Sequence, residues 1–270
     1  MPRHEYLKPG DEKLPGSAGD AVFALVVVAM FVGAWAMLVS GAAIASAIAI
    51  VGFALALAWR IRTMLRPRLA RDIQAAQLER LREHVPAAIA KCRALLRRGL
   101  AAYWRAQVLV VLGECAEMEG DFAEAAAIFV RAEGILRAAR LHGVLRAQQL
   151  AVVAAKRAFA HAALGELDRA EATLRTAGVR DGVPLAGPLS CRAMLLVLAR
   201  RGLKQQVLER LATDAKLLRN GLAFRDRALV AVIGAYATSR TIPHGSVDAS
   251  IVPWLTSAFP EATATLGGAP

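Results

Sequence analysis

The sequence predicts an all-α protein in which a two-helix transmembrane hairpin is followed by a domain of paired helices. Residues 21–59 contain no charged side chain, and a run of this length is about twice what one membrane-spanning helix requires. Beyond Arg60, alanine, leucine and arginine dominate and aromatic residues are few, which favours helices over strands. Glycines separate segments whose apolar residues recur with a helical period.

We expect residues 1–19, which are rich in proline and glycine, to be disordered. A cleaved signal peptide is the alternative interpretation of the apolar run, because Ala45-Ser46-Ala47 resembles a cleavage site. Signal peptides, however, have a basic start and an apolar region of about 7–15 residues. Here residues 1–20 carry a net charge of −1 and the apolar run continues beyond the site, so we expect no cleavage.

The predicted hairpin, residues 20–59, divides at Ser40-Gly41 into two helices. Each is roughly 27 Å long at about 1.5 Å per residue, close to the thickness of the hydrocarbon core. The turn is so short that the helices must lie antiparallel, with both chain ends on one side of the membrane. Transporters and channels usually carry charged groups within the membrane. Residues 21–59 have none, which indicates an anchor.

Residues 60–83 are predicted to form a basic juxtamembrane helix. Residues 60–105 carry twelve basic and three acidic groups, and the positive-inside rule therefore places both termini and the following domain in the cytoplasm. A second interpretation is a surface that binds anionic lipid headgroups. We expect no nucleic-acid binding, because no recognition motif occurs. The predicted headgroup-binding residues are Arg60, Arg62, Arg66, Arg68 and Arg71.

Residues 84–240 contain a motif of small and aromatic residues at a fixed spacing. Its members are Leu112-Gly113, Gly120-Asp121-Phe122, Ala125, Phe129 and Ala132. This motif resembles the tetratricopeptide repeat, a pair of antiparallel helices joined by a glycine-containing turn. Gly113 on the first helix and Ala125 on the second are small enough for the helices to approach closely, and Phe129 fills the space beyond. Asp121 is a suitable N-cap for the second helix.

The turn recurs twice further along the chain. Gly165 repeats the register after 45 residues, and Gly202 repeats it after a further 37. Upstream, Pro86 suits the first turn of the second helix of an earlier unit. The family period is about 34 residues, so we expect longer helices or extra linker rather than a regular superhelix. A nonspecific bundle of α-helices is the alternative interpretation.

Residues 241–270 form a tail that is rich in proline, glycine and threonine and contains no lysine or arginine. Its one apolar cluster is Ile251-Val252-Pro253-Trp254-Leu255. We expect a short helix there that docks on the last repeat and covers an open apolar face. We expect the stretch after Phe259 to be frayed.

No residues form a recognisable catalytic, cofactor or metal site. The five histidines are dispersed, and no HExxH, Walker or dinucleotide-binding motif occurs. The cysteines Cys92, Cys115 and Cys191 are far apart and no CxxC occurs, so we expect buried free thiols in a reducing compartment. We therefore expect no cofactor and no enzymatic activity.

The resemblance to tetratricopeptide repeats implies a function, because such repeats bind peptides or partner proteins through a concave face lined by the first helix of each pair. It implies a membrane-anchored, non-enzymatic scaffold that binds a partner protein or peptide segment. The alternative is a membrane-surface or membrane-shaping protein that acts through the hairpin and the arginines, with repeats that only support homo-oligomers. The first-helix positions could also simply pack against their neighbours. Mapped by register, the partner-binding positions are Gln107, Val110, Glu114, Glu117, Lys156, Phe159, Arg192 and Leu196.

Overall fold

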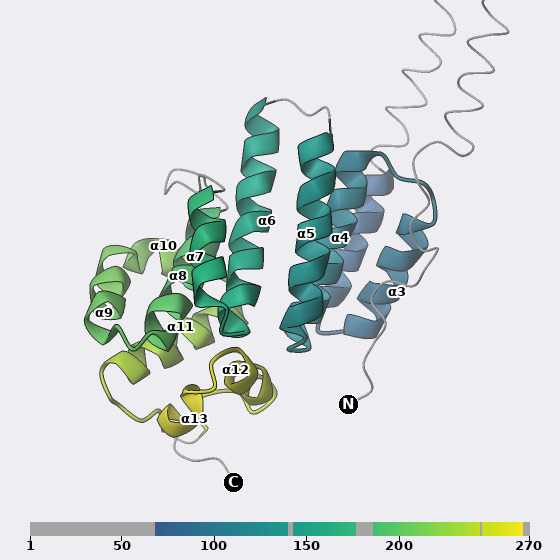
Figure 1. Cartoon of the computed structure of the whole chain (residues 1–270). Coiled ribbons are helices and arrows are strands. Elements are labelled where there is room, and N and C mark those ends of the chain that lie inside the picture. Colours follow the sequence, from purple (N-terminus) through teal and green to yellow (C-terminus); the bar gives the residue numbers. More distant parts are fainter. Residues whose placement is uncertain (1–67, 140–142, 177–185, 244, 267–270) are drawn as a thin grey trace, which may run out of the picture. The chain divides into compact units, whose positions relative to one another are not determined.

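The computed structural model describes residues 68–139, 143–176, 186–243 and 245–266. Every regular element in these ranges is a helix and none is a strand (Figure 1), which confirms the all-α class for this part of the chain. The predicted hairpin, residues 20–59, lies outside the described residues. Within the described ranges, no helix has the length and the apolar character that a membrane span requires.

The first of two compact units comprises residues 1–101. Its described part contains a helix through residues 68–81 and the helix α3 (Val85–Leu96). Pro86 occupies the first turn of α3, as predicted. Between the two helices, Glu83 has a positive φ of 64° and forms a tight turn. The buried apolar residues of this pair are Ile73, Ala76, Val85, Ala88, Ile89, Cys92, Leu95 and Leu96.

The second compact unit, residues 102–270, is built from consecutive helix pairs. Its helices are α4 (Ala102–Met118), α5 (Phe122–Ala138), α6 (Gly143–Ala163), α7 (Leu167–Thr176), α8 (Ala186–Arg200), α9 (Lys204–Thr213), α10 (Ala215–Gly221), α11 (Phe224–Ala237), α12 (Val252–Ala258) and α13 (Ala262–Thr265). α4 packs against α5, α6 against α7 and α8 against α9. α6 also packs against α5 and α8, so the pairs stack in sequence order (Figure 1).

One turn geometry recurs between the helices of these pairs. Gly120, Gly165 and Gly202 have φ angles of +79°, +84° and +72°. The amide of the next residue donates in each case to the carbonyl five positions earlier, over 2.9–3.0 Å, which satisfies a carbonyl at the end of the first helix. Glu83, 37 residues before Gly120, and Ser239, 37 residues after Gly202, have positive φ angles and the same hydrogen bond. The turns that the sequence pattern predicts thus share one backbone conformation and one hydrogen bond.

α4 and α5 approach closely at Gly113, as the motif predicts. A Cβ atom at Gly113 would lie 2.5 Å from Cε1 of Phe129, so no side chain fits between the helices at this point. Phe129 and Ala125 are fully buried. The Asp121 side chain caps α5 by accepting a hydrogen bond from the amide of Glu124 at 3.1 Å.

The longer interval between Gly120 and Gly165 is accommodated by a longer first helix. α6 has 21 residues, whereas α4 has 17 and α8 has 15. Residues 143–148, at the beginning of α6, are exposed, and Figure 1 shows this end of α6 extending beyond α7 and α8. The additional residues therefore lengthen one helix without changing the turn that follows it.

The chain after α11 does not form a second helix at the regular position. α12 contains the predicted apolar cluster but begins only at Val252. Nε1 of Trp254 donates to the carbonyl of Glu117, near the end of α4, over 2.7 Å. Phe259 lies edge-on to Tyr236 of α11, with ring centroids 5.2 Å apart. The expected short helix is thus present, and its segment contacts α4 as well as the last helix of the stack.

The expectation that the chain frays after Phe259 is wrong for residues 260–266. α13 forms there, and both Ala262 and Leu266 are buried. α13 packs on α11, and the amide of Ile242 donates to the carbonyl of Thr265 over 2.8 Å. Apolar burial and this hydrogen bond order a stretch whose composition alone predicts fraying.

Candidate functional site

The structure places the eight predicted partner-binding residues on the first helix of each pair. Gln107, Val110, Glu114 and Glu117 lie on α4, Lys156 and Phe159 on α6, and Arg192 and Leu196 on α8. All eight are buried or half-buried. Val110 and Leu196 belong to the apolar core, while the other six make contacts that link α4, α6 and α8.

Two of these contacts join α4 to α6. Nζ of Lys156 lies 2.6 Å from Oε1 of Glu114, and each side chain is only 12% exposed. Gln107 donates through Nε2 to Oε1 of Gln149, on α6, over 2.7 Å. The charged and amide groups on this part of α4 therefore have partners within the fold.

Arg192 joins four helices at a buried position. The side chain is 2% exposed, and its Nη1 lies 2.9 Å from Oε1 of Glu117 and contacts Oδ1 of Asp226 on α11. Its guanidinium carbon lies 3.7 Å from the ring centroid of Phe159. Burial alone would lower the pKa of Arg192, but the charges of Asp226 and Glu117 outweigh burial and raise it above its ordinary value. We call these four residues the Arg192 cluster.

Trp254 of α12 covers the Arg192 cluster. Its ring stacks on Phe159, with centroids 6.3 Å apart and an angle of 25° between the planes, and its Nε1–H bonds the backbone of Glu117. The apolar cluster in the tail predicts that Trp254 is buried, but it does not predict that Trp254 packs on Phe159. Asp226 has no comparable signal in the sequence. Partner binding by Glu117, Phe159 and Arg192 stays a prediction, and within the chain these residues contact one another.

A surface groove of about 560 Å³ lies between α5, α6 and α7. We call it the outer groove. At its edges the apolar side chains of Val130 and Leu164 are 49% and 42% exposed. Its walls contain the small residues Ala123, Ala126, Ala127 and Ala172. Small wall residues let the backbone of a bound segment approach closely, and the exposed apolar edges favour a partner that covers them.

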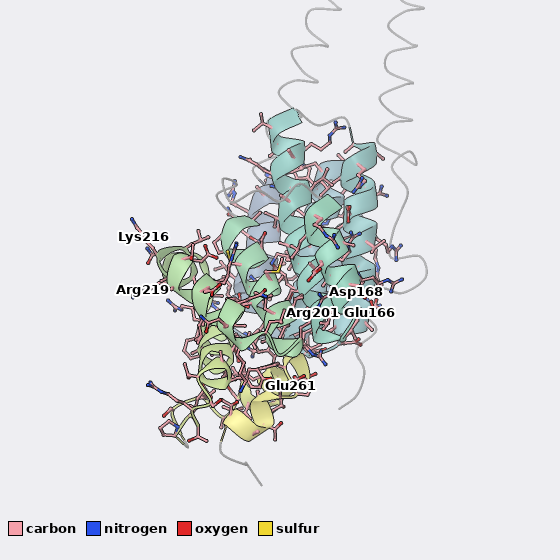
Figure 2. The ribbon with its side chains drawn as sticks, turned by 60° about the vertical axis from the view of Figure 1, so that its left-hand side comes forward. Glu166, Asp168, Arg201, Lys216, Arg219 and Glu261 are labelled. Atoms are coloured by element: carbon pink, nitrogen blue, oxygen red, sulfur yellow. The ribbon has the colours of Figure 1, made fainter. Side chains whose placement is uncertain are left out.

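His161 and Glu166 form a hydrogen-bonded pair in the outer groove. Nδ1 of His161 lies 2.8 Å from Oε2 of Glu166, to which Arg169 also donates over 3.0 Å. The hydrogen bond from Arg169 lowers the pKa of Glu166, and burial lowers the pKa of His161. The imidazole is therefore neutral at neutral pH and donates its Nδ1–H to the carboxylate. Two residues further along the chain, Oδ1 of Asp168 lies 2.6 Å from Nη2 of Arg201 (Figure 2).

Arg157, on α6, contacts both α5 and α7 at the outer groove. Its Nη1 lies 2.5 Å from Oε2 of Glu133 on α5, and its Nη2 donates to the hydroxyl of Thr173 on α7 over 3.3 Å. The guanidinium thus bridges the two helices that flank α6. A half-buried cation with partners on both walls gives the groove a defined width.

The described residues contain no group of three or more histidine, cysteine, aspartate or glutamate side chains that could hold a metal ion. Cys92, Cys115 and Cys191 are free and buried. Burial raises the pKa of Cys191 to about 11, so its thiol is protonated at neutral pH and is a poor nucleophile.

The predicted headgroup-binding arginines lie partly beyond the described chain. Arg60, Arg62 and Arg66 lie outside the described residues. Arg68 and Arg71 are exposed on the helix through residues 68–81. Leu78 and Leu81 are exposed on the same helix.

Comparisons of the chain with protein-family models, with curated proteins and with solved structures gave no match. Membership of the tetratricopeptide repeat family therefore stays a prediction that rests on the motif. The recurring helix pairs and the recurring turn geometry are observed independently of any family.

Proposed function

We propose that the chain is a membrane-anchored, non-enzymatic scaffold whose tetratricopeptide-like helical repeats bind a partner protein on the cytoplasmic side of a membrane. Residues 20–59 would form the anchor, residues 60–83 the basic juxtamembrane helix and residues 84–240 the repeat domain. The uncharged run of 39 residues and the paired helices with one recurring turn support this proposal.

The outer groove is the observation that carries the proposal. The eight first-helix positions are buried or half-buried within the chain, and a partner that used Glu117 or Phe159 would have to displace Trp254. The outer groove instead has exposed apolar edges at Val130 and Leu164 and alanine walls. A helix or an extended segment of a partner could cover both edges without unfolding any element. We therefore assign partner binding to this groove.

Site-specific photo-crosslinking of the full-length chain in its native membrane tests the assignment. A photoreactive residue at Ala127, which lies in the outer groove, should crosslink to one protein. The matched control is Val144, which is 63% exposed at the beginning of α6 and should give no such product. Val130→Asp should abolish the product from Ala127, because a carboxylate at the groove edge opposes apolar contact. Equal products from both positions, or a product that Val130→Asp leaves unchanged, would contradict the assignment.

A second candidate function is binding to the surface of an anionic membrane. The helix through residues 68–81 supports it, because Leu78 and Leu81 are exposed alongside Arg71. Arg71 and Leu78 are seven residues apart and therefore lie on one face of the helix. Such a face suits the boundary between headgroups and acyl chains. The segment from residue 60 onward should then float with liposomes that contain anionic lipid. With neutral liposomes it should stay at the bottom of the gradient. Flotation that does not weaken as salt increases would contradict an electrostatic contribution.

A further inference from the structure

The repeat leaves one helix position unfilled after α11. α5, α7 and α9 each begin two residues after the left-handed turn, at Phe122, Leu167 and Lys204. The equivalent turn at Ser239 is followed by Thr241, Ile242 and Pro243, and the next helix begins only at Val252. α13 packs on part of α11, but the face of α11 that a second helix would cover remains partly open.

This open face forms a groove of about 540 Å³, which we call the α11 groove. α11 contributes Phe224, Arg227, Ala228 and Ala231, and the segment after α11 contributes Ile242, Val247, Asp248 and Ile251. Phe224, at the beginning of α11, is 59% exposed. It is the one aromatic residue with a predominantly exposed side chain in the described part of the chain. An aromatic ring in water beside an apolar groove marks a contact surface.

The surface carries features that complement each other. A protruding ring, Phe224, lies on the same surface as a hollow with alanine, isoleucine and valine side chains. Arg227 on α11 and Asp248 on the following segment both line the groove and have opposite charges. Asp248 accepts a hydrogen bond from the amide of Ser250 at 2.9 Å, and the charge of Arg225 also acts on its carboxylate, while Arg227 is exposed.

A two-fold dimer uses the same patch on both subunits, so every feature of the patch must meet its complement. In such a dimer, the Phe224 ring of each copy enters the α11 groove of the other. Arg227 of each copy then faces Asp248 of the other copy. A single partner with one acidic or one basic face would match only one of these two charges. The presence of both charges favours a second copy of the chain as the occupant.

We propose that the α11 groove is a self-association surface, at which two copies of this chain dock about a two-fold axis with Phe224 of each in the groove of the other. The central contact is an aromatic ring that becomes buried, and the flanking contact is the pair of opposite charges. Buried aromatic anchors of this kind provide much of the binding energy at interfaces. The proposal goes beyond partner binding and uses residues that the outer groove does not contain.

The mass of the full-length protein in detergent micelles, measured by sedimentation equilibrium over a wide range of concentration, tests the proposal. The wild type should form a dimer. Phe224→Asp should raise the dissociation constant of the dimer by at least about tenfold, as expected for loss of a central aromatic anchor. Val144→Asp is the matched control, because Val144 is also exposed but lies on α6, and it should leave the dissociation constant unchanged.

A charge swap then tests the two-fold geometry. Arg227→Asp and Asp248→Arg should each weaken the dimer, because like charges then face each other. The double variant should restore the wild-type dissociation constant. All three variants alter exposed side chains, and far-UV circular dichroism checks that each retains its helices.

Three results would overturn self-association at this surface: a wild-type monomer at all concentrations, a dimer that Phe224→Asp leaves intact, or a double swap as weak as the single variants. Continued growth beyond the dimer would indicate a head-to-tail contact and would also overturn the two-fold arrangement. None of these results bears on crosslinking at Ala127, so failure here and failure of the proposed function are distinguishable.

Discussion

Gly113→Ala tests the close packing of α4 on α5. The added Cβ would lie 2.5 Å from Cε1 of Phe129 and 2.9 Å from Cδ1 and Cζ of the same ring. Phe129 is fully buried, so its ring cannot turn away without displacing other core side chains. Either the two helices must separate at this point or the ring must leave its position.

Two opposing contributions set the magnitude. Replacing a helical glycine by alanine favours the helix by about 1 kcal/mol, whereas overpacking a close-packed core costs about 1–3 kcal/mol. The contacts at Gly113 fall well inside van der Waals distance, which places overpacking in the upper part of that range. We therefore expect a net loss of about 1–2 kcal/mol in the free energy of unfolding.

Gly134→Ala is the matched control for the same chemical change. Gly134 is exposed on α5 and nothing lies within 4 Å of its Cβ position, so only the gain in helix propensity of about 1 kcal/mol remains. Urea unfolding of the full-length protein, followed by far-UV circular dichroism, measures both variants. Phe129→Leu combined with Gly113→Ala should recover part of the loss in a non-additive way. A Gly113→Ala variant as stable as the wild type would refute the close contact.

Three further predictions concern the described residues. Arg192→Met should lower the free energy of unfolding by about 3–5 kcal/mol, because Glu117 and Asp226 would be left without their cation. Arg201→Met, which removes pairs with Asp168 and Glu171 near the surface, should have a much smaller effect, and equal losses in urea unfolding would argue against the buried cluster. Burial lowers the pKa of His161 in the folded state, so the stability linked to its neutral form is present above the unfolded pKa of about 6.5 and decreases as the pH falls toward the folded pKa. His161→Gln should therefore reduce the loss of stability between about pH 7 and pH 5, and an unchanged loss in urea unfolding at the two pH values would contradict this linkage. Because the cysteines are buried and the pKa of Cys191 is raised to about 11, a thiol reagent at mildly alkaline pH should modify the unfolded protein quickly and the native protein slowly, and rapid reaction of Cys191 in the native protein would be inconsistent with its burial.

The helix pairs of the second unit could be predicted because their determinants are local. The Gly120-Asp121 turn requires only a residue that tolerates positive φ followed by a capping side chain. The contact of Gly113 with Phe129 requires only that two helices of known register are antiparallel neighbours. The turn at Gly165 follows from the same pattern, although the longer α6 changes the interval.

The Arg192 cluster could not be predicted because its members are distant in the sequence. Glu117, Phe159, Arg192 and Asp226 come from four helices, and only the path of the tail brings Trp254 over Phe159. The same path explains why the tail is ordered beyond Phe259, since apolar burial there depends on the position of α11. Periodicity identified the register of the first helices, but it does not distinguish an open face from a covered one.

The outer groove and the α11 groove were also beyond sequence reasoning. Arg157 was not a candidate, because its bridging role depends on Glu133 and Thr173 lying on either side of α6. Phe224 has no special context in the sequence, and its exposure depends on the missing second helix after Ser239. Each groove is a surface that neighbouring elements leave uncovered. Local sequence patterns do not specify which surfaces are left uncovered.

Membrane association of the full-length chain tests the central claim most directly. Membranes from cells that produce the chain are washed with alkaline carbonate, and a reporter fused after Pro270 reports on which side of the membrane it lies. We predict that the chain stays in the membrane pellet, that deletion of residues 20–59 releases it, and that the reporter is active only in the cytoplasm. A full-length chain that is released without detergent, or a reporter that is active outside the cytoplasm, would contradict the membrane-anchored scaffold.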